Sequence, residues 1–98
     1  MHYLFEWDPA KAITNQRRHG IRFERAATIF QDPSQISIYD EEHSSDEDRW
    51  VTLGMDAGGT PLVVVHTFRM NPNGDVTIRL ISARRATRRE AQQYAEFR

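Results

Sequence analysis

Apolar residues along this chain follow the spacing of β-strands in some segments and that of α-helices in others. The points where the spacing changes mark the limits of the expected strands and helices. Continuous or alternating apolar residues predict five strands, at residues 3–7, 36–39, 49–56, 62–69 and 76–83. Helical spacing predicts three helices, at residues 9–19, at residues 23–31 and from Thr87 to about residue 97. The expected order is therefore β-α-α-β-β-β-β-α.

Residues at the ends of these segments support their limits. Asp8 followed by Pro9 is typical of a helix N-terminus, and Gly20 provides a C-terminal stop. Thr87 and Glu90 form a capping-box pattern. Short turn-forming loops between the later strands imply an antiparallel meander, and helices must cover one face of it to bury their apolar sides. The sequence thus predicts an α+β, two-layer domain over residues 1–98.

Strand alternation sorts the side chains between the two faces of this sheet. Ile78 and Leu80 are expected to face the helices and Arg79 the open side, since an unpaired buried charge is costly. If His66 shares the open side, it lies near Arg79 on an adjacent strand. A one-residue bulge would invert that arrangement.

Composition narrows the class of protein. With 98 residues, 39% hydrophobic and 28% charged, the chain fits one soluble domain with a small core. It has no cysteine, which excludes disulfides and thiolate metal sites. No segment approaches the roughly 18 apolar residues of a membrane span. The first residues lack the pattern of an export signal, so we expect a cytoplasmic protein.

The net charge of −1 conceals a strong separation of charges. Residues 40–48 hold six carboxylates and no cationic lysine or arginine, whereas residues 76–90 are rich in arginine. Dense guanidinium groups indicate nucleic acid or an acidic partner. The arginines of this second segment are Arg79, Arg84, Arg85, Arg88 and Arg89.

Several motifs resemble those of a known family, in the expected order and over nearly the whole chain. In the first half they are Phe5-Glu-Trp-Asp-Pro-Ala-Lys11, Asn15-Gln-Arg-Arg-His-Gly20, Phe23-Glu24 and Phe30-Gln-Asp-Pro33. In the second half they are Arg49, Leu53-Gly54, Val63-Val-Val-His66 and Ile78-Arg-Leu-Ile-Ser-Ala-Arg84, followed by Glu90 and Tyr94. Together these motifs resemble the BrnT family.

This resemblance implies a toxin of a toxin–antitoxin system with a RelE-like fold. Such toxins cut RNA without a metal or other cofactor and arrest translation. The resemblance also implies a BrnA-like antitoxin partner in a 2:2 heterotetramer. Two features differ from the family pattern: Arg18 stands where lysine is common before the His-Gly pair, and the chain is slightly acidic overall.

Metal-independent RNA cleavage needs a base for the ribose 2′-hydroxyl, positive charge at the phosphate and an acid for the departing 5′-oxygen. The residues predicted to be catalytic are His19, Glu24, His66, Arg79 and Arg84. Those predicted to bind substrate are Arg18, Arg49, Ser82 and Arg85. We expect these guanidinium groups to converge in one concave patch.

Each assignment has a structural alternative that the sequence leaves open. Arg79 can form a cross-strand ion pair, and Arg84 can pair with an acidic segment or a partner. His19 can cap a helix, His66 can be a hydrogen-bonded ring in the sheet, and Glu24 can serve a helix N-terminus. A catalytically degenerate RNA- or protein-binding module of the same fold is the alternative function.

Overall fold

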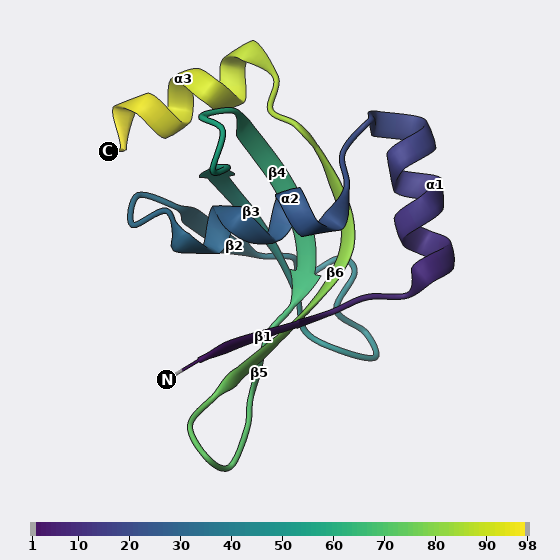
Figure 1. Cartoon of the computed structure of the whole chain (residues 1–98). Helices are drawn as coiled ribbons and strands as arrows, with labels where there is room; N and C mark the ends of the chain where they lie inside the picture. Colours follow the sequence, from purple (N-terminus) through teal and green to yellow (C-terminus); the bar gives the residue numbers. More distant parts are fainter. Residues whose placement is uncertain (1, 98) are drawn as a thin grey trace.

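The structure, a computed structural model, describes residues 2–97 and confirms the α+β class. The strands are β1 (Tyr3–Glu6), β2 (Ile36–Tyr39), β3 (Arg49–Met55), β4 (Pro61–Thr67), β5 (Arg69–Met70) and β6 (Val76–Arg85). The helices are α1 (Pro9–His19), α2 (Phe23–Ala27), the 3₁₀ helix η1 (Thr28–Gln31) and α3 (Arg88–Glu96) (Figure 1). Two differences in detail are the short strand β5 and the 3₁₀ geometry of residues 28–31, which the sequence predicts as α-helix.

The sheet has the order β1-β6-β4-β3-β2, and β5 pairs with β6. Strands β2, β3, β4 and β6 form the predicted antiparallel meander. Strand β1 differs, because it pairs with β6 in parallel and places Glu6 opposite Arg79. The first and last strands of the chain thereby lie side by side, a long-range pairing that hairpin patterns do not reveal.

Local signals set the helix ends as the sequence indicates. The Asp8 carboxylate accepts a hydrogen bond from the backbone N–H of Ala10 at 2.8 Å, and Gly20 ends α1 with a φ of 70°. Thr87 and Glu90 form both halves of a capping box at the start of α3. These bonds satisfy backbone groups that helix ends leave unpaired.

The core lies between one face of the sheet and the segment of α2 and η1 (Figure 1). Phe23, Ile29 and Phe30 from the helices pack over strand residues that include Leu62 and Leu80. Gly54 lets η1 approach the sheet, since a Cβ there would lie 3.1 Å from the Ile29 Cβ. Ala12 of α1 also packs against this core.

Helix α1 lies along β6 beyond the end of its pairing with β1. The buried amide of Asn15 donates to the backbone carbonyl of Ala83 and accepts from its N–H, both at 2.9 Å. The side chain thus replaces a neighbouring strand there. Helix α3 lies at the far end of the sheet, where the Tyr94 hydroxyl donates to Asp32 (Figure 1). Among the described residues, no helix combines the length and apolar character needed to cross a membrane.

A bulge decides which side chains share a face. The register between β4 and β6 shifts between Val65, which pairs with Ser82, and His66, which pairs with Leu80. Because Leu80 faces the core, His66 faces it as well and is only 2% exposed. His66 and Arg79 therefore lie on opposite faces, and the expectation that they share the open side is wrong.

Candidate functional site

The predicted site residues do not converge in one patch but occupy several separate places along β6 and its neighbours. Arg79 lines a cleft of about 280 Å³, which we call the Arg79 cleft. Its other principal residues are Glu6, Glu47, Asp48, Phe68 and Arg69. Two guanidinium groups, three carboxylates and an aromatic ring thus border one space.

Strand geometry positions Arg79 in this cleft. Its backbone N–H donates to the Thr67 hydroxyl at 3.3 Å, and the parallel register places Glu6 beside it. Its guanidinium forms an ion pair with Glu47 from the acidic loop. The Arg79 side chain keeps 39% of its surface exposed, so this pair borders solvent. An exposed pair of this kind contributes little stability and leaves the cation accessible to an anion.

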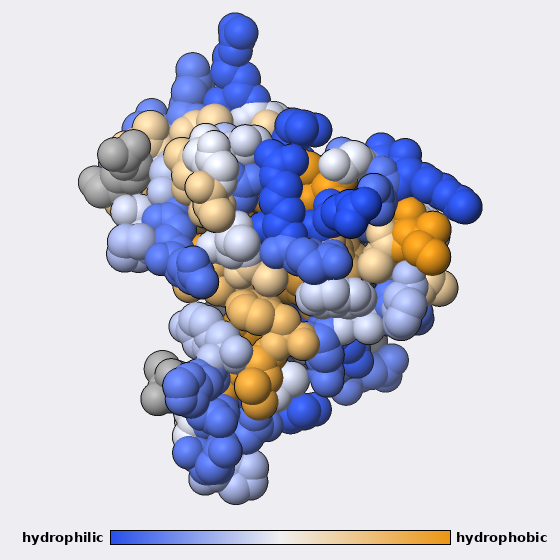
Figure 2. Space-filling view, viewed as in Figure 1, coloured by the Kyte–Doolittle hydropathy of each residue, from blue (hydrophilic) through white to orange (hydrophobic). Residues whose placement is uncertain are grey.

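The Phe68 ring stands at the rim of this cleft and is 43% exposed. An exposed phenyl ring beside guanidinium groups provides a surface on which a planar group can stack. Figure 2 shows apolar surface gathered between the larger part of the molecule and the β5 hairpin, with further apolar areas higher on the same, mostly hydrophilic face.

A second hollow, which we call the α1 groove, brings together three of the predicted residues. Arg18 and His19 from α1 meet Ser82 from β6 in a space of about 320 Å³. Lys11 joins them from the first turns of the same helix. No carboxylate is among the described residues that line this groove. Its charge is therefore positive, which suits a polyanion.

Arg84 is held in a local structural pair. Its guanidinium donates two hydrogen bonds to the Glu90 carboxylate, at 2.7 and 3.0 Å. These hydrogen bonds raise the pKa of Arg84 and lower the pKa of Glu90 to about 2. Glu90 also accepts the backbone N–H of Thr87 at 2.8 Å, so the pair is built into the start of α3. Arg85 is exposed at the end of β6.

Arg49 and Glu24 lie outside both hollows. Arg49 lines a depression among acidic-loop residues that include Glu42 and Asp46, and its Nε is buried without a hydrogen-bond partner among the described residues. Glu24 is exposed in the first turn of α2. Arg49 thus borders a neighbouring depression that shares Glu47 with the Arg79 cleft, whereas Glu24 lines neither space. Within residues 2–97, no three histidine or carboxylate side chains are arranged to hold a metal ion.

His66 is a buried ring with both nitrogens engaged. Nδ1 lies 2.9 Å from the Thr67 carbonyl, and Nε2 lies 2.6 Å from the Thr52 hydroxyl. Its ring meets that of Phe30 edge to face at 4.8 Å. Burial lowers the pKa of His66, and the hydrogen bond to Thr67 only partly opposes this shift. The geometry favours the structural alternative for His66 over proton transfer to a substrate.

Sequence reasoning missed five charged or aromatic residues that the structure places at the Arg79 cleft: Glu6, Glu47, Asp48, Phe68 and Arg69. Nothing local links Glu47 to Arg79, because the two are joined only by the path of the acidic loop. The place of Lys11 in the α1 groove could have been predicted from the sequence, since it lies two helical turns before Arg18 on the same side of α1. That spacing predicts a shared cationic stripe.

Comparisons with known proteins bear on the family and the fold of the chain. The family model described as "Ribonuclease toxin, BrnT, of type II toxin-antitoxin system" matches residues 7–90. Among solved structures, the ribonuclease toxin BrnT of Brucella abortus is similar, with a TM-score of 0.60 and 20% sequence identity. The match covers 90% of this chain and 100% of that one, and at this identity it supports the fold. No curated protein matches the chain.

Proposed function

Because the chain belongs to the BrnT family of ribonuclease toxins of type II toxin–antitoxin systems, we propose that it is a metal-independent endoribonuclease acting at the Arg79 cleft. The observation that carries this proposal is the meeting of two arginines, two glutamates, Asp48 and an exposed phenyl ring in one cleft. These groups match the needs of RNA cleavage: positive charge, a proton acceptor and a surface for a base.

In the proposed reaction, the ribose 2′-oxygen attacks the adjacent phosphorus. Glu6 accepts the 2′-hydroxyl proton, and its place on β1 fixes it beside Arg79. Arg79 and Arg69 stabilise the extra negative charge on the phosphate oxygens. Removal of a single donor of this kind lowers the reaction rate about 10²- to 10³-fold. The bond from phosphorus to the 5′-oxygen breaks, and that oxygen takes a proton from solvent. The products carry a 2′,3′-cyclic phosphate and a 5′-hydroxyl.

Glu47 orients the guanidinium of Arg79 in this proposal and is displaced by the substrate phosphate. The α1 groove then holds a neighbouring stretch of the RNA backbone. Ser82 lies three residues beyond Arg79 on β6, roughly 10 Å away at about 3.3 Å per residue. This spacing allows one RNA strand to contact both hollows. His19, at the inner end of the groove, serves the substrate rather than the reacting bond.

The partner and the physiological effect follow from family membership and stay proposals for this chain. A BrnA-like antitoxin neutralises the toxin in a complex of two copies of each protein. Cleavage of cytoplasmic RNA arrests translation. Support for this part comes from the type II toxin–antitoxin family itself.

The decisive experiment incubates the purified protein with RNA, with and without a metal chelator. We expect cleavage that survives chelation and products that end in a cyclic phosphate. Arg79→Ala should slow cleavage about 10²- to 10³-fold without unfolding the protein. Cleavage that stops with chelator would contradict the metal-independent mechanism.

The degenerate binding module predicts a different result. It is favoured by the ion pair that already engages Arg79 and by the net charge of −1. In that case RNA binds and stays intact, and the wild type and the Arg79→Ala variant behave alike in the cleavage assay.

A further inference from the structure

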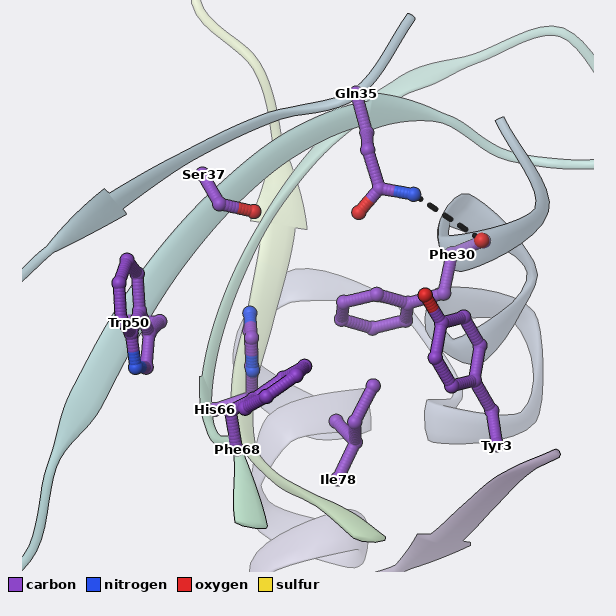
Figure 3. A pocket seen from close by; sticks show the side chains of 8 residues that line it. All are labelled: Tyr3, Phe30, Gln35, Ser37, Trp50, His66, Phe68 and Ile78. Atoms are coloured by element: carbon purple, nitrogen blue, oxygen red, sulfur yellow. Dashed lines mark hydrogen bonds between the residues drawn. The ribbon is translucent and has the colours of Figure 1, made fainter. Parts of the chain in front are cut away.

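A third hollow lies on the helix side of the sheet and adjoins the Arg79 cleft. It encloses about 170 Å³, and Phe68 lines both spaces. Aromatic rings from three further elements surround it, those of Tyr3, Phe30 and Trp50 (Figure 3). This volume is below the roughly 300–1,000 Å³ typical of drug-sized ligands. The hollow, called the aromatic pocket below, therefore suits a single planar ring system.

Hydrogen-bond directions at the inner end of this pocket are fixed by a chain of side chains. A carbonyl only accepts, so His66 donates from Nδ1 to the Thr67 carbonyl, 2.9 Å away. The neutral ring then accepts at Nε2 from the Thr52 hydroxyl, 2.6 Å away. The Thr52 oxygen in turn takes the hydroxyl hydrogen of Ser37 at 2.7 Å. Ser37 therefore offers only lone pairs to the pocket.

Gln35 presents a second acceptor. Its Nε2 donates to the backbone carbonyls of Phe30 and Asp32, both at 3.1 Å, which fixes the orientation of the amide. Oε1 consequently points into the space between the Phe30 ring and Ser37 (Figure 3). No donor from the described part of the chain is recorded for this oxygen. Two acceptors thus face a pocket whose other lining residues are aromatic rings and Ile78.

We propose that this pocket holds the nucleobase next to the scissile phosphate and prefers guanine. The proposal rests on the proposed function and adds its base preference. Guanine donates from N1 and from its 2-amino group on one edge, which matches the two acceptors at Gln35 and Ser37. Uracil offers one N–H between two carbonyl oxygens, and these would oppose the acceptor lone pairs. Stacking on aromatic rings supplies the sequence-independent part of the affinity.

The position of the pocket supports a nucleotide over an apolar side chain from a protein. Thr67 and His66 are consecutive, and they face the Arg79 cleft and the aromatic pocket respectively. Since β4 ends at Thr67, a nucleotide passes from one space to the other over Phe68. An aliphatic anchor would leave the acceptors of Gln35 and Ser37 without a donor, which is costly in a desolvated site.

The first test titrates guanosine and uridine 5′-monophosphate into the full-length protein and follows the two tryptophan indole N–H signals by NMR. Trp50 lines the pocket, whereas Trp7 packs on Phe23 with ring centroids 5.8 Å apart. We expect the Trp50 signal to shift, the Trp7 signal to stay, and guanosine monophosphate to bind at least about fivefold more tightly. Equal affinities or an unmoved Trp50 signal would overturn the proposal.

The second test replaces one acceptor. Ser37→Ala should weaken guanosine monophosphate binding about three- to tenfold, as the loss of one hydrogen bond implies, and leave uridine monophosphate binding nearly unchanged. Ser45→Ala, at an exposed serine of the acidic loop, is the matched control. Equal effects of Ser37→Ala on both nucleotides would contradict the assignment.

Failure of the pocket and failure of the proposed function give different results. If the wild type cuts RNA and Ser37→Ala cuts it at the same positions, the guanine preference of the pocket is refuted. The proposed nuclease activity is then still supported. If the wild type cuts no RNA but still binds guanosine monophosphate at Trp50, the proposed nuclease activity is refuted. The assignment of the pocket as a guanine site is then still supported. If only a partner protein moves the Trp50 signal, the pocket is a protein-docking site and the proposal is wrong.

Discussion

Arg79 and Arg84 lie on the same strand and each pairs with a glutamate, yet the two pairs differ in construction. Glu90 is a short way along the chain from Arg84, accepts two hydrogen bonds from it and also caps α3 through Thr87. Glu47 reaches Arg79 from a distant loop, and their pair borders an open cleft. A pair tied to backbone groups is structural, whereas a pair at an open cleft can exchange its anion for a substrate.

The largest expected effect comes from removing the cation of the open pair. Arg79→Ala should lower the rate of RNA cleavage about 10²- to 10³-fold, because the phosphate loses a preorganised donor. Circular dichroism should show an intact fold. Arg84→Ala is the matched control and should keep nearly full cleavage per folded molecule. If the two variants lose activity equally, the distinction between the pairs fails.

A smaller effect is expected in the α1 groove, whose cations have no acidic neighbour among its described lining residues. Arg18→Ala and Lys11→Ala should each weaken RNA binding several-fold, with little dependence on sequence. Each should also reduce the slope of log affinity against log salt by about one. Filter binding between 50 and 200 mM salt, the range over which such contacts weaken, measures this. An unchanged slope would remove the groove from the RNA path.

The two glutamates should differ in their contributions to stability. Glu90→Gln should lower the free energy of unfolding by about 1 kcal/mol, since it weakens a bidentate pair and a helix cap. Glu47→Gln should change stability by less than about 0.5 kcal/mol, as expected for an exposed pair. Urea denaturation of both variants compares them directly. A larger loss for Glu47→Gln would show that the open pair is structural.

The smallest expected effect is the loss of folding stability at acidic pH. Hydrogen bonds from Arg84 lower the pKa of Glu90 from about 4.5 to about 2. Because the folded-state pKa is the lower one, the pair stabilises the fold above about pH 4.5 and loses that contribution as the pH falls toward 2. Wild type should therefore lose more stability than Glu90→Gln in this window, by an amount on the order of 1 kcal/mol or less. Parallel losses would exclude Glu90 as the group responsible.

Much of the fold was predictable because its signals are local. The Asp8 cap, the Gly20 stop and the Thr87–Glu90 box act within one helical turn, and the structure places each helix end where they indicate. The 3₁₀ geometry after α2 was not, since α and 3₁₀ turns share nearly the same apolar spacing. Nor was the pairing of β1 with β6, which depends on packing between distant segments.

The candidate site was predictable only in part. Arg79 faces the open side as expected, and Arg18, His19 and Ser82 meet in one groove. The expected convergence of all the arginines is not found, because Arg79 and Arg84 point to different glutamates. His66 faces the core because it keeps the alternation of β4 with Leu62 and Val64, and the bulge in β6 places Leu80 opposite it.

By itself, the sequence determined the elements, their caps and the separation of acidic from basic segments, because hydrophobic periodicity and capping depend on neighbours a few residues apart. Its motifs also carried the resemblance to a toxin family. Only the tertiary structure decided which carboxylate meets which arginine and which face receives His66. Those outcomes follow from strand register and loop path, where a shift of one residue reverses a side chain and no local free energy specifies the partner.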